Sequence, residues 1–123
     1  MKQRIMVVED DRPIIEMMEL MLGRLGYEPV TSMDGYSALS EVKTNPPALI
    51  LLDVMMMPMD GWEFLERIRA EPTTKEMPVL LFTAHPSVES RAAALNDPRL
   101  GIVLKPVTLP ELGKAIRRFL GPD

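Results

Sequence analysis

The chain of 123 residues contains no cysteine. Disulfide bonds, thiolate nucleophiles and thiolate metal sites are therefore excluded, and the composition fits a reducing, cytoplasmic location. Aromatic residues make up only 5% of the sequence. No apolar stretch approaches the ~20 residues that a membrane-spanning helix needs, so we expect no contact with a membrane. The first residues turn acidic after a few apolar positions, which argues against a signal peptide.

An excess of positive charge is also missing. The chain has 14 basic and 18 acidic residues and a formal net charge of −4. Bulk electrostatics therefore favour no direct binding of nucleic acid. The length suits one domain with one hydrophobic core. We expect a single domain over residues 1–123, either as a protein in its own right or as part of a longer regulator.

Short apolar runs alternate with longer amphipathic patterns along the whole chain. Strands are expected over residues 5–8, 28–31, 48–52, 78–82 and 102–104. Helical patterns follow them over residues 13–25, 35–44, 61–70, 88–95 and 109–120. Strands separated by helices favour a parallel sheet with helices on both faces, so the predicted fold class is α/β.

Polar side chains follow four of these strands, at the edge where open parallel sheets place their functional sites. Glu9 and Asp10 follow the first strand, Asp53 the third, Thr83 the fourth and Lys105 the fifth. We expect these three acids, one hydroxyl and one cation to converge. Carboxylates gathered at one point repel one another unless a cation compensates them. Mg²⁺ fits best, because it takes one or two carboxylates together with water, carbonyl and phosphate oxygens.

The predicted magnesium ligands come from the first and third strand ends. Asp10 and Asp53 are assigned as direct ligands, Glu9 as a ligand bound directly or through water, and the Met55 backbone carbonyl as a further ligand. A carboxylate held in this way can attack phosphorus and form an aspartyl phosphate. Such a transfer needs mainly positioning and charge neutralisation. Mg²⁺, the Lys105 ammonium and the Thr83 hydroxyl at this edge of the sheet would supply them.

Five short motifs carry a resemblance to a known family. They are VVEDD at 7–11, LLDVM at 51–55, MDG at 59–61, FTA at 82–84 and LKP at 104–106. In these motifs and their spacing the sequence resembles the receiver domain of response regulators in two-component signalling. The resemblance covers the whole chain and implies a (βα)5 doubly wound, five-stranded parallel sheet of the flavodoxin-like type. It further implies the strand order 2-1-3-4-5.

The resemblance also implies roles and partners. Asp53 would be phosphorylated by a phosphohistidine on a sensor histidine kinase or a histidine phosphotransfer protein, while Glu9 and Asp10 would hold Mg²⁺. Thr83 and Lys105 would sense the phosphoryl group and switch a surface that binds a downstream protein target. A homodimer that forms on phosphorylation is left open. Such a domain catalyses only its own phosphorylation and dephosphorylation and is not a turnover enzyme.

Three departures from the family concern the loop and the readout. The family's proline four residues after the aspartate is replaced by Met57, with Pro58 one residue late, although Gly61 keeps its usual distance. Ile102 stands where relatives have a rotating tyrosine or phenylalanine, and we expect it to be packed. The stretch Asn96–Arg99 replaces a common Gly-Ala. The chemistry therefore resembles the family's, whereas the readout differs.

Three alternatives stay open. A degenerate receiver could act as a binding module without phosphorylation, in view of Pro58 and Ile102. A phosphohydrolase of the haloacid dehalogenase type needs a second aspartate where Met55 stands. A flavodoxin-like cofactor protein needs a glycine-rich phosphate loop after the first strand, where the acids would repel a phosphate.

Smaller expectations concern the methionines and two loop residues. Met17, Met18 and Met21 are expected to fill the core from the first helix, and Met56 and Met57 to pack against neighbouring helices. The acid that follows Asp10 is expected to cap the first helix. The single histidine, two residues after Thr83, either flanks the phosphoryl group with Met55 or is an exposed loop residue. The Lys105–Pro106 peptide bond is expected to be cis, as in many relatives.

Overall fold

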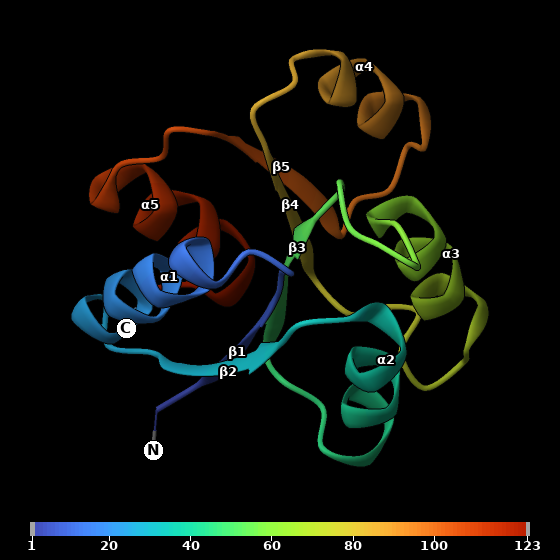
Figure 1. Cartoon of the computed structure of the whole chain (residues 1–123), viewed down its shortest axis with the longest axis horizontal. Helices are drawn as coiled ribbons and strands as arrows, with labels where there is room; N and C mark the ends of the chain where they lie inside the picture. The colour runs from blue at the N-terminus through green and yellow to red at the C-terminus, as the bar shows by residue number, and fades with distance from the viewer. Residues whose placement is uncertain (1, 123) are drawn as a thin grey trace.

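The computed structural model describes residues 2–122, in which five strands alternate with five helices. The elements are β1 (Arg4–Val8), α1 (Arg12–Arg24), β2 (Glu28–Ser32), α2 (Gly35–Thr44), β3 (Leu49–Asp53), α3 (Gly61–Ala70), β4 (Val79–Thr83), α4 (Ser87–Ala94), β5 (Leu100–Leu104) and α5 (Leu109–Leu120). All strand pairs are parallel, and their order is β2-β1-β3-β4-β5 (Figure 1). The predicted α/β fold class and strand order are confirmed.

The helices cover both faces of the sheet. In Figure 1, α1 and α5 lie on the left of the sheet, and α2, α3 and α4 lie on the right. Each face has its own hydrophobic core, because successive side chains of a strand point to opposite faces. One core contains Met18, Leu22, Leu51, Phe82, Leu112 and Ile116 among its members. The other contains Ala38, Val42, Ile50, Phe64, Ile68 and Val88 among its members.

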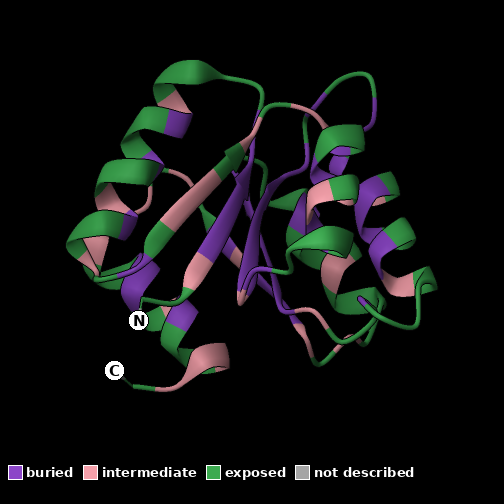
Figure 2. Cartoon of the chain, turned by 90° about the horizontal axis from the view of Figure 1, so that it is seen from below, coloured by how far each residue is buried: buried purple, intermediate pink, exposed green. Residues whose placement is uncertain are grey.

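The neighbouring strands β3 and β4 are buried along their whole length, and Figure 2 shows buried residues in purple. Uninterrupted aliphatic runs are typical of such strands, because a parallel sheet with helices on both faces excludes water from both sides. Their register pairs Asp53 with Phe82, and Thr83 with Leu104 on β5. The carboxyl ends of β3, β4 and β5 therefore meet at one edge of the sheet.

Side-chain caps define the starts of three helices. The Asp34 carboxylate accepts the Ser37 N–H at 2.8 Å at the start of α2, and Asp60 begins α3 in the same way. A capping box at Thr108 begins α5, which the sequence placed over residues 109–120. Asp11 occupies the cap position of α1 but makes no side-chain cap hydrogen bond. Pro13 stands at the second helical position there and has no N–H to donate.

The prediction that three methionines of α1 fill the core is only partly right. Met18 is fully buried with Ile15 and Leu22, and Met21 is half-buried. Met17 is 44% exposed, so that expectation is wrong. Positions 15, 18 and 22 share one helical face, whereas Met17 lies about 100° away from Met18 around the axis.

The loop between β3 and α3 also divides its methionines. Met56 and Met59 are buried, whereas Met57 is 76% exposed, so the packing expected for Met57 is wrong. The peptide bond that follows it, Met57–Pro58, is cis, as is Lys105–Pro106, where the cis bond was expected. Ile102, which stands where relatives have a rotating aromatic residue, is half-buried and packs against the core beneath α4, as expected.

None of the helices in residues 2–122 is both long and apolar enough to cross a bilayer.

Candidate functional site

The predicted site residues meet at a small cavity of about 260 Å³ at the carboxyl edge of the sheet. The side chains that line it come from the ends of β1, β3, β4 and β5 and from the start of α1. They are Glu9, Asp10, Asp11, Ile14, Asp53, Met55, Thr83, Ala84, His85 and Lys105. The structure thus brings together every residue that the sequence placed in the site.

Three carboxylates dominate this cavity. Glu9, Asp10 and Asp53 each offer an oxygen, and these atoms all lie within 4.8 Å of one another. Glu9 is 1% exposed and Asp53 5% exposed, while Asp10 is exposed to solvent. Within residues 2–122, neither carboxylate oxygen of Glu9 has a hydrogen-bond partner. An unsatisfied buried carboxyl costs free energy, so this position is explained best by a group that the protein binds.

Electrostatics support the same conclusion. Burial, and then the neighbouring Asp53 carboxylate, raise the pKa of Glu9 to about 9, against the opposing effect of Lys105. The Lys105 ammonium lies 3.8 Å from Glu9 Oε1 and neutralises only part of the negative charge. A hard divalent cation with oxygen ligands would remove the repulsion, and the three carboxylates are a suitable donor set for Mg²⁺.

The backbone fixes the acidic side chains. The Glu9 N–H donates to the Ser32 carbonyl at 3.1 Å and extends the pairing of β1 with β2 by one residue. The Met55 N–H donates to Asp53 Oδ1 at 3.2 Å, which fixes the rotation of that carboxylate. Met55 itself is 64% exposed at the cavity mouth. Its N–H contact is observed, whereas metal binding by its carbonyl stays a prediction.

Gly61 lets α3 begin directly beside the site. Its N–H donates to the Val54 carbonyl at 3.0 Å. A Cβ atom at this position would lie 2.6 Å from the Asp53 carbonyl oxygen and 2.7 Å from Val54 Cα. Both neighbours are backbone atoms and cannot rotate away. The close approach therefore requires glycine and explains why the MDG motif stands at this distance from Asp53.

The hydroxyl and the cation of the site are linked through the backbone. Thr83 ends β4, is 1% exposed, and its Oγ1 accepts the His85 N–H at 3.1 Å. The Lys105 N–H donates to the Thr83 carbonyl at 2.7 Å. The Lys105 ammonium also lies 4.7 Å from the centroid of the Phe82 ring. The contact of Phe82, in the FTA motif, could not be predicted from the sequence, because contact between a cation and a ring depends on packing between strands.

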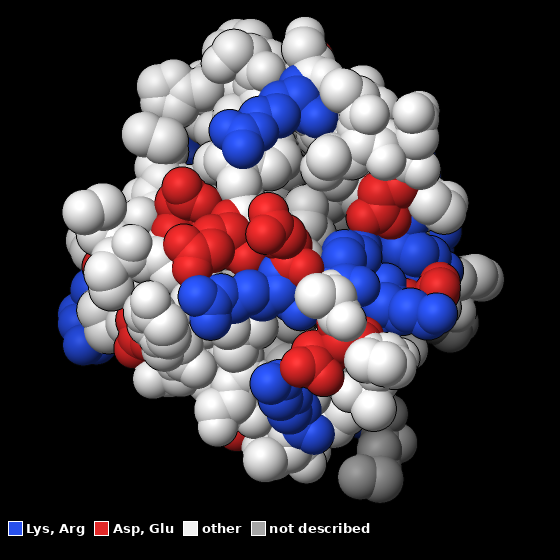
Figure 3. All heavy atoms as spheres, turned by 90° about the vertical axis from the view of Figure 1, so that its right-hand side faces the viewer, with Lys and Arg blue, Asp and Glu red and all other residues white. Residues whose placement is uncertain are grey.

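A larger cavity of about 900 Å³ lies between α3 and α4. Its charged side chains largely pair with one another, as in the Arg67–Glu63 and Arg69–Asp97 ion pairs, both at 2.7 Å. Figure 3 shows this side of the molecule, where acidic and basic side chains are interspersed. The smaller cavity at the carboxyl edge of the sheet (the rim cavity) is therefore the stronger candidate for a functional site, because its negative charges are only partly compensated.

A comparison with protein families agrees with this geometry. The model of the response regulator receiver domain matches residues 5–117. The chain belongs to this family. Receiver domains are signalling modules of two-component systems, and phosphoryl transfer at an acidic Mg²⁺ site is general among them.

Curated relatives of this receiver domain are response regulators. It is 35% identical over 125 residues to the phosphate regulon transcriptional regulatory protein PhoB of Escherichia coli, covering 99% of this chain and 55% of the relative. It is 36% identical over 130 residues to the response regulator MprA of a Mycobacterium species, covering all of this chain and 56% of the relative. The chain thus spans about half the length of these relatives.

Solved receiver structures resemble it closely. The N-terminal domain of a response regulator receiver protein from Methanoculleus marisnigri is 40% identical, covers 98% of both chains and has a TM-score of 0.78. The receiver domain of a sensor histidine kinase from Pseudomonas aeruginosa is 27% identical, covers 99% of this chain and all of its own, and has a TM-score of 0.88. That domain holds a magnesium ion coordinated in its active-site cleft.

Proposed function

We propose that this receiver domain accepts a phosphoryl group from phosphohistidine on Asp53, with Mg²⁺ bound, and thereby switches a protein-interaction surface. The observation that carries the proposal is the acidic cluster. Oxygens of Glu9, Asp10 and Asp53 lie within 4.8 Å of one another, and those of Glu9 are buried without a partner among the described residues. Lys105 supplies a cation at the same cavity.

The chain offers a consistent set of magnesium ligands. Asp10 and Asp53 would bind the ion directly, Glu9 directly or through water, and Met55 through its backbone carbonyl. When bound, Mg²⁺ supplies positive charge that offsets the negative charge of the phosphoryl oxygens. The Pseudomonas relative with a magnesium ion in its cleft supports this assignment.

The reacting groups belong to the chain and its phosphodonor. A carboxylate oxygen of Asp53 attacks phosphorus, so an O–P bond forms while the N–P bond of phosphohistidine breaks. The electron pair of the broken bond stays on the imidazole nitrogen, and no general base is needed. The Lys105 ammonium binds a phosphoryl oxygen. The Thr83 hydroxyl donates to another, because its contact with His85 uses only the oxygen as acceptor.

The proposal includes the domain's partners. The phosphodonor is a sensor histidine kinase or a histidine phosphotransfer protein, and the output is a downstream protein target. Residues 1–123 act as one receiver domain in the cytoplasm, without direct contact with nucleic acid or membrane, and a phosphorylation-dependent homodimer is compatible with this function. The domain turns over no small phosphoester, since Met55 occupies the place where a phosphohydrolase would need a second aspartate.

The test uses small phosphodonors, which need no cognate kinase. The protein is incubated with acetyl phosphate, or with beryllofluoride, in the presence of Mg²⁺ and then followed by mass spectrometry and NMR. We expect one phosphoryl group on the wild type, none on Asp53→Asn and none in EDTA. An equal adduct on Asp53→Asn would contradict the proposal. A wild type without any adduct would favour the alternative, a binding module that acts without phosphorylation.

A further inference from the structure

The Lys105 ammonium contacts an aromatic ring at the candidate site. It lies 4.7 Å from the centroid of Phe82, within the distance of about 6 Å at which a cation and a ring face attract each other. Three other such contacts occur in residues 2–122, and all of them are made by arginines that do not line the rim cavity. Among these contacts, only the one with Phe82 involves a cation, Lys105, that lines the cavity and has a role in the proposed phosphoryl transfer.

Phe82 is held rigidly by the sheet. It is 1% exposed, pairs with Asp53 on β3 and Val103 on β5, and packs in the core between the sheet and helices α1 and α5. Its ring also borders a cavity of about 320 Å³ together with Lys105 and Pro106. The buried ring is fixed more firmly than the partly exposed lysine, so the contact sets mainly the position of the ammonium.

Lys105 needs such support, because its side chain has four rotatable carbon bonds and is 24% exposed. Its contact with Glu9, at 3.8 Å, is the only ion pair of this lysine in the described part of the chain. Glu9 is also a proposed magnesium ligand, and a carboxylate shared with a metal attracts a second cation less strongly. The contact with the ring does not involve Glu9 and would therefore persist when the metal is bound.

We propose that Phe82 is a positioning residue for Lys105. Its ring holds the ammonium at the cavity, so that the ammonium meets a phosphoryl oxygen without first losing conformational freedom. This inference rests on the proposed phosphorylation of Asp53 and adds a residue to it. Phe82 does not line the cavity at which the metal and the phosphoryl group would bind, so it would act only on the step that uses Lys105.

The experiment removes the ring while keeping a buried apolar side chain. Phe82→Leu and Phe82→Met are compared with Phe82→Tyr, which retains a ring. We measure the rate of phosphorylation by acetyl phosphate, the affinity for beryllofluoride at saturating Mg²⁺, and the affinity for Mg²⁺ alone. The two ring-free variants should lose about 3- to 30-fold in rate and in beryllofluoride affinity, with unchanged Mg²⁺ affinity. Phe82→Tyr should keep the values of the wild type.

Two controls separate positioning from general loss of packing. Leu80→Val removes volume from the same face of β4 and should leave phosphorylation unchanged. In a Lys105→Met background, Phe82→Leu should have no further effect, because the ammonium is absent. A spectroscopic control is available as well. The ε-methylene protons of Lys105 should show a ring-current shift in the wild type and in Phe82→Tyr, but not in Phe82→Leu.

Three results would overturn the inference. The first is phosphorylation of both ring-free variants at the wild-type rate. The second is a loss of Mg²⁺ affinity as large as the loss of beryllofluoride affinity. The third is a slower phosphorylation caused by Phe82→Leu even in the Lys105→Met background. Should Phe82→Leu fail to fold, Phe82→Met, closer in shape and length, provides the same comparison. Failure of the proposed function would look different, because the wild type would then form no adduct on Asp53.

Discussion

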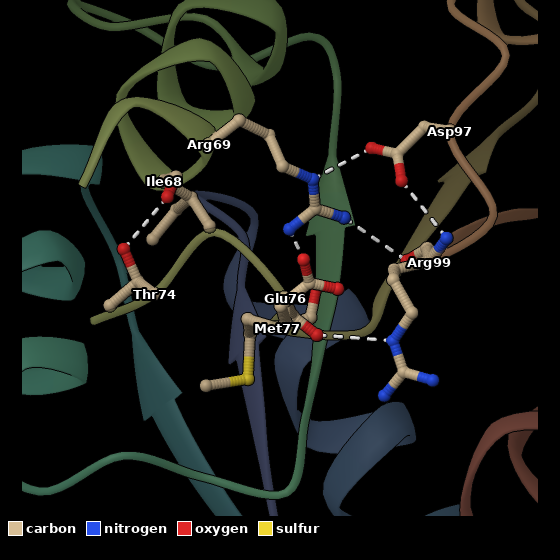
Figure 4. A network of polar contacts seen from close by, with 7 residues as sticks. All are labelled: Ile68, Arg69, Thr74, Glu76, Met77, Asp97 and Arg99. Atoms are coloured by element: carbon tan, nitrogen blue, oxygen red, sulfur yellow. Dashed lines mark hydrogen bonds and ion pairs between the residues drawn. The ribbon is translucent and has the colours of Figure 1, made fainter. Parts of the chain in front are cut away.

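Two clusters of charged residues lie at opposite edges of the same sheet and differ in how their charges are satisfied. At the carboxyl edge, Glu9 is buried without a hydrogen-bond partner among residues 2–122. At the amino edge, Arg69 donates to Asp97 Oδ2 and to the Met77 carbonyl, both at 2.7 Å, and to the Arg99 carbonyl at 3.1 Å (Figure 4). The charged groups of the Arg69 cluster thus have hydrogen-bond and ion-pair partners, whereas Glu9 in the acidic cluster lacks hydrogen-bond partners.

The difference indicates a structural role for the Arg69 cluster, whereas the acidic cluster has the role of a binding site in the proposed function. The Arg69 cluster ties the end of α3 to the start of β4 and to the connection between α4 and β5. Asp97 also accepts the Arg99 N–H at 2.9 Å, and Arg99 Nε donates to the Glu76 carbonyl at 3.1 Å. The stretch Asn96–Arg99, which departs from the family, thus has a structural purpose. Removing one partner of a partly buried ion pair destabilises a fold, whereas a buried polar group without a partner is explained by a bound ion or ligand.

The largest expected effect comes from replacing the buried carboxyl group of Glu9. The pKa of Glu9 rises from 4.5 to about 9 in the folded protein. As the pH increases across that window, the unfolded chain releases this proton while the folded chain retains it, so stability falls. Glu9→Gln removes the titration. In EDTA, its free energy of unfolding should exceed that of the wild type by an amount that grows to several kcal/mol towards pH 9.

Urea unfolding at a series of pH values measures this difference. Mg²⁺ should stabilise the wild type at pH 8 and should stabilise Glu9→Gln much less. Parallel pH profiles for the two proteins would mean that Glu9 is not strained in the metal-free fold.

The balanced cluster should respond in the opposite way. Arg69→Met removes three hydrogen bonds and leaves Asp97 as a partly buried charge, at a cost of about 2–4 kcal/mol. Mg²⁺ affinity should not change. Arg67→Met is the matched control on the same helix, because its ion pair with Glu63 is exposed, and it should cost at most about 0.5 kcal/mol. Thermal unfolding compares the three proteins, and equal losses in both variants would remove the contrast between the clusters.

A smaller effect is expected at Gly61, which lies against the backbone of Asp53 and Val54 beside the acidic site. Gly61→Ala places a Cβ against backbone atoms of Asp53 and Val54 and should cost about 1–3 kcal/mol. The displaced loop should also weaken Mg²⁺ binding, which calorimetry can measure. Gly23→Ala serves as the control, since nothing lies within 4 Å of its Cβ position in α1, and it should stabilise by about 0.5–1 kcal/mol. Unchanged Mg²⁺ affinity in Gly61→Ala would show that the site tolerates a shifted loop.

Much of the fold follows from local patterns that the sequence displays directly. Aliphatic runs such as Leu49–Leu52 predict buried strands, and the Thr108 capping box predicts the start of α5. Asp53 and Lys105 could be placed at one edge because all strands of a parallel sheet end on the same side. Element ends were predicted less well: β5 begins at Leu100, two residues earlier than expected.

Exposure of individual side chains was harder to predict, because composition and spacing do not show which way a loop turns. Met56 and Met57 are identical residues at consecutive positions, yet one is buried and the other is 76% exposed. The same limit applies to the cap of α1, where Asp11 occupies the cap position without making a side-chain cap hydrogen bond.

The sequence by itself determined the order of the elements and the residue types at the strand ends, because hydrophobic periodicity, caps and motif spacing are properties of the chain. Only the tertiary structure decided which charges are balanced. Glu9 lacks a hydrogen-bond partner within the described chain, Arg69 has three acceptors, and Lys105 rests on Phe82. The contacts of Arg69 with Asp97 and Arg99, and of Lys105 with Phe82, join residues far apart in sequence, and they arise only when strands and helices pack together.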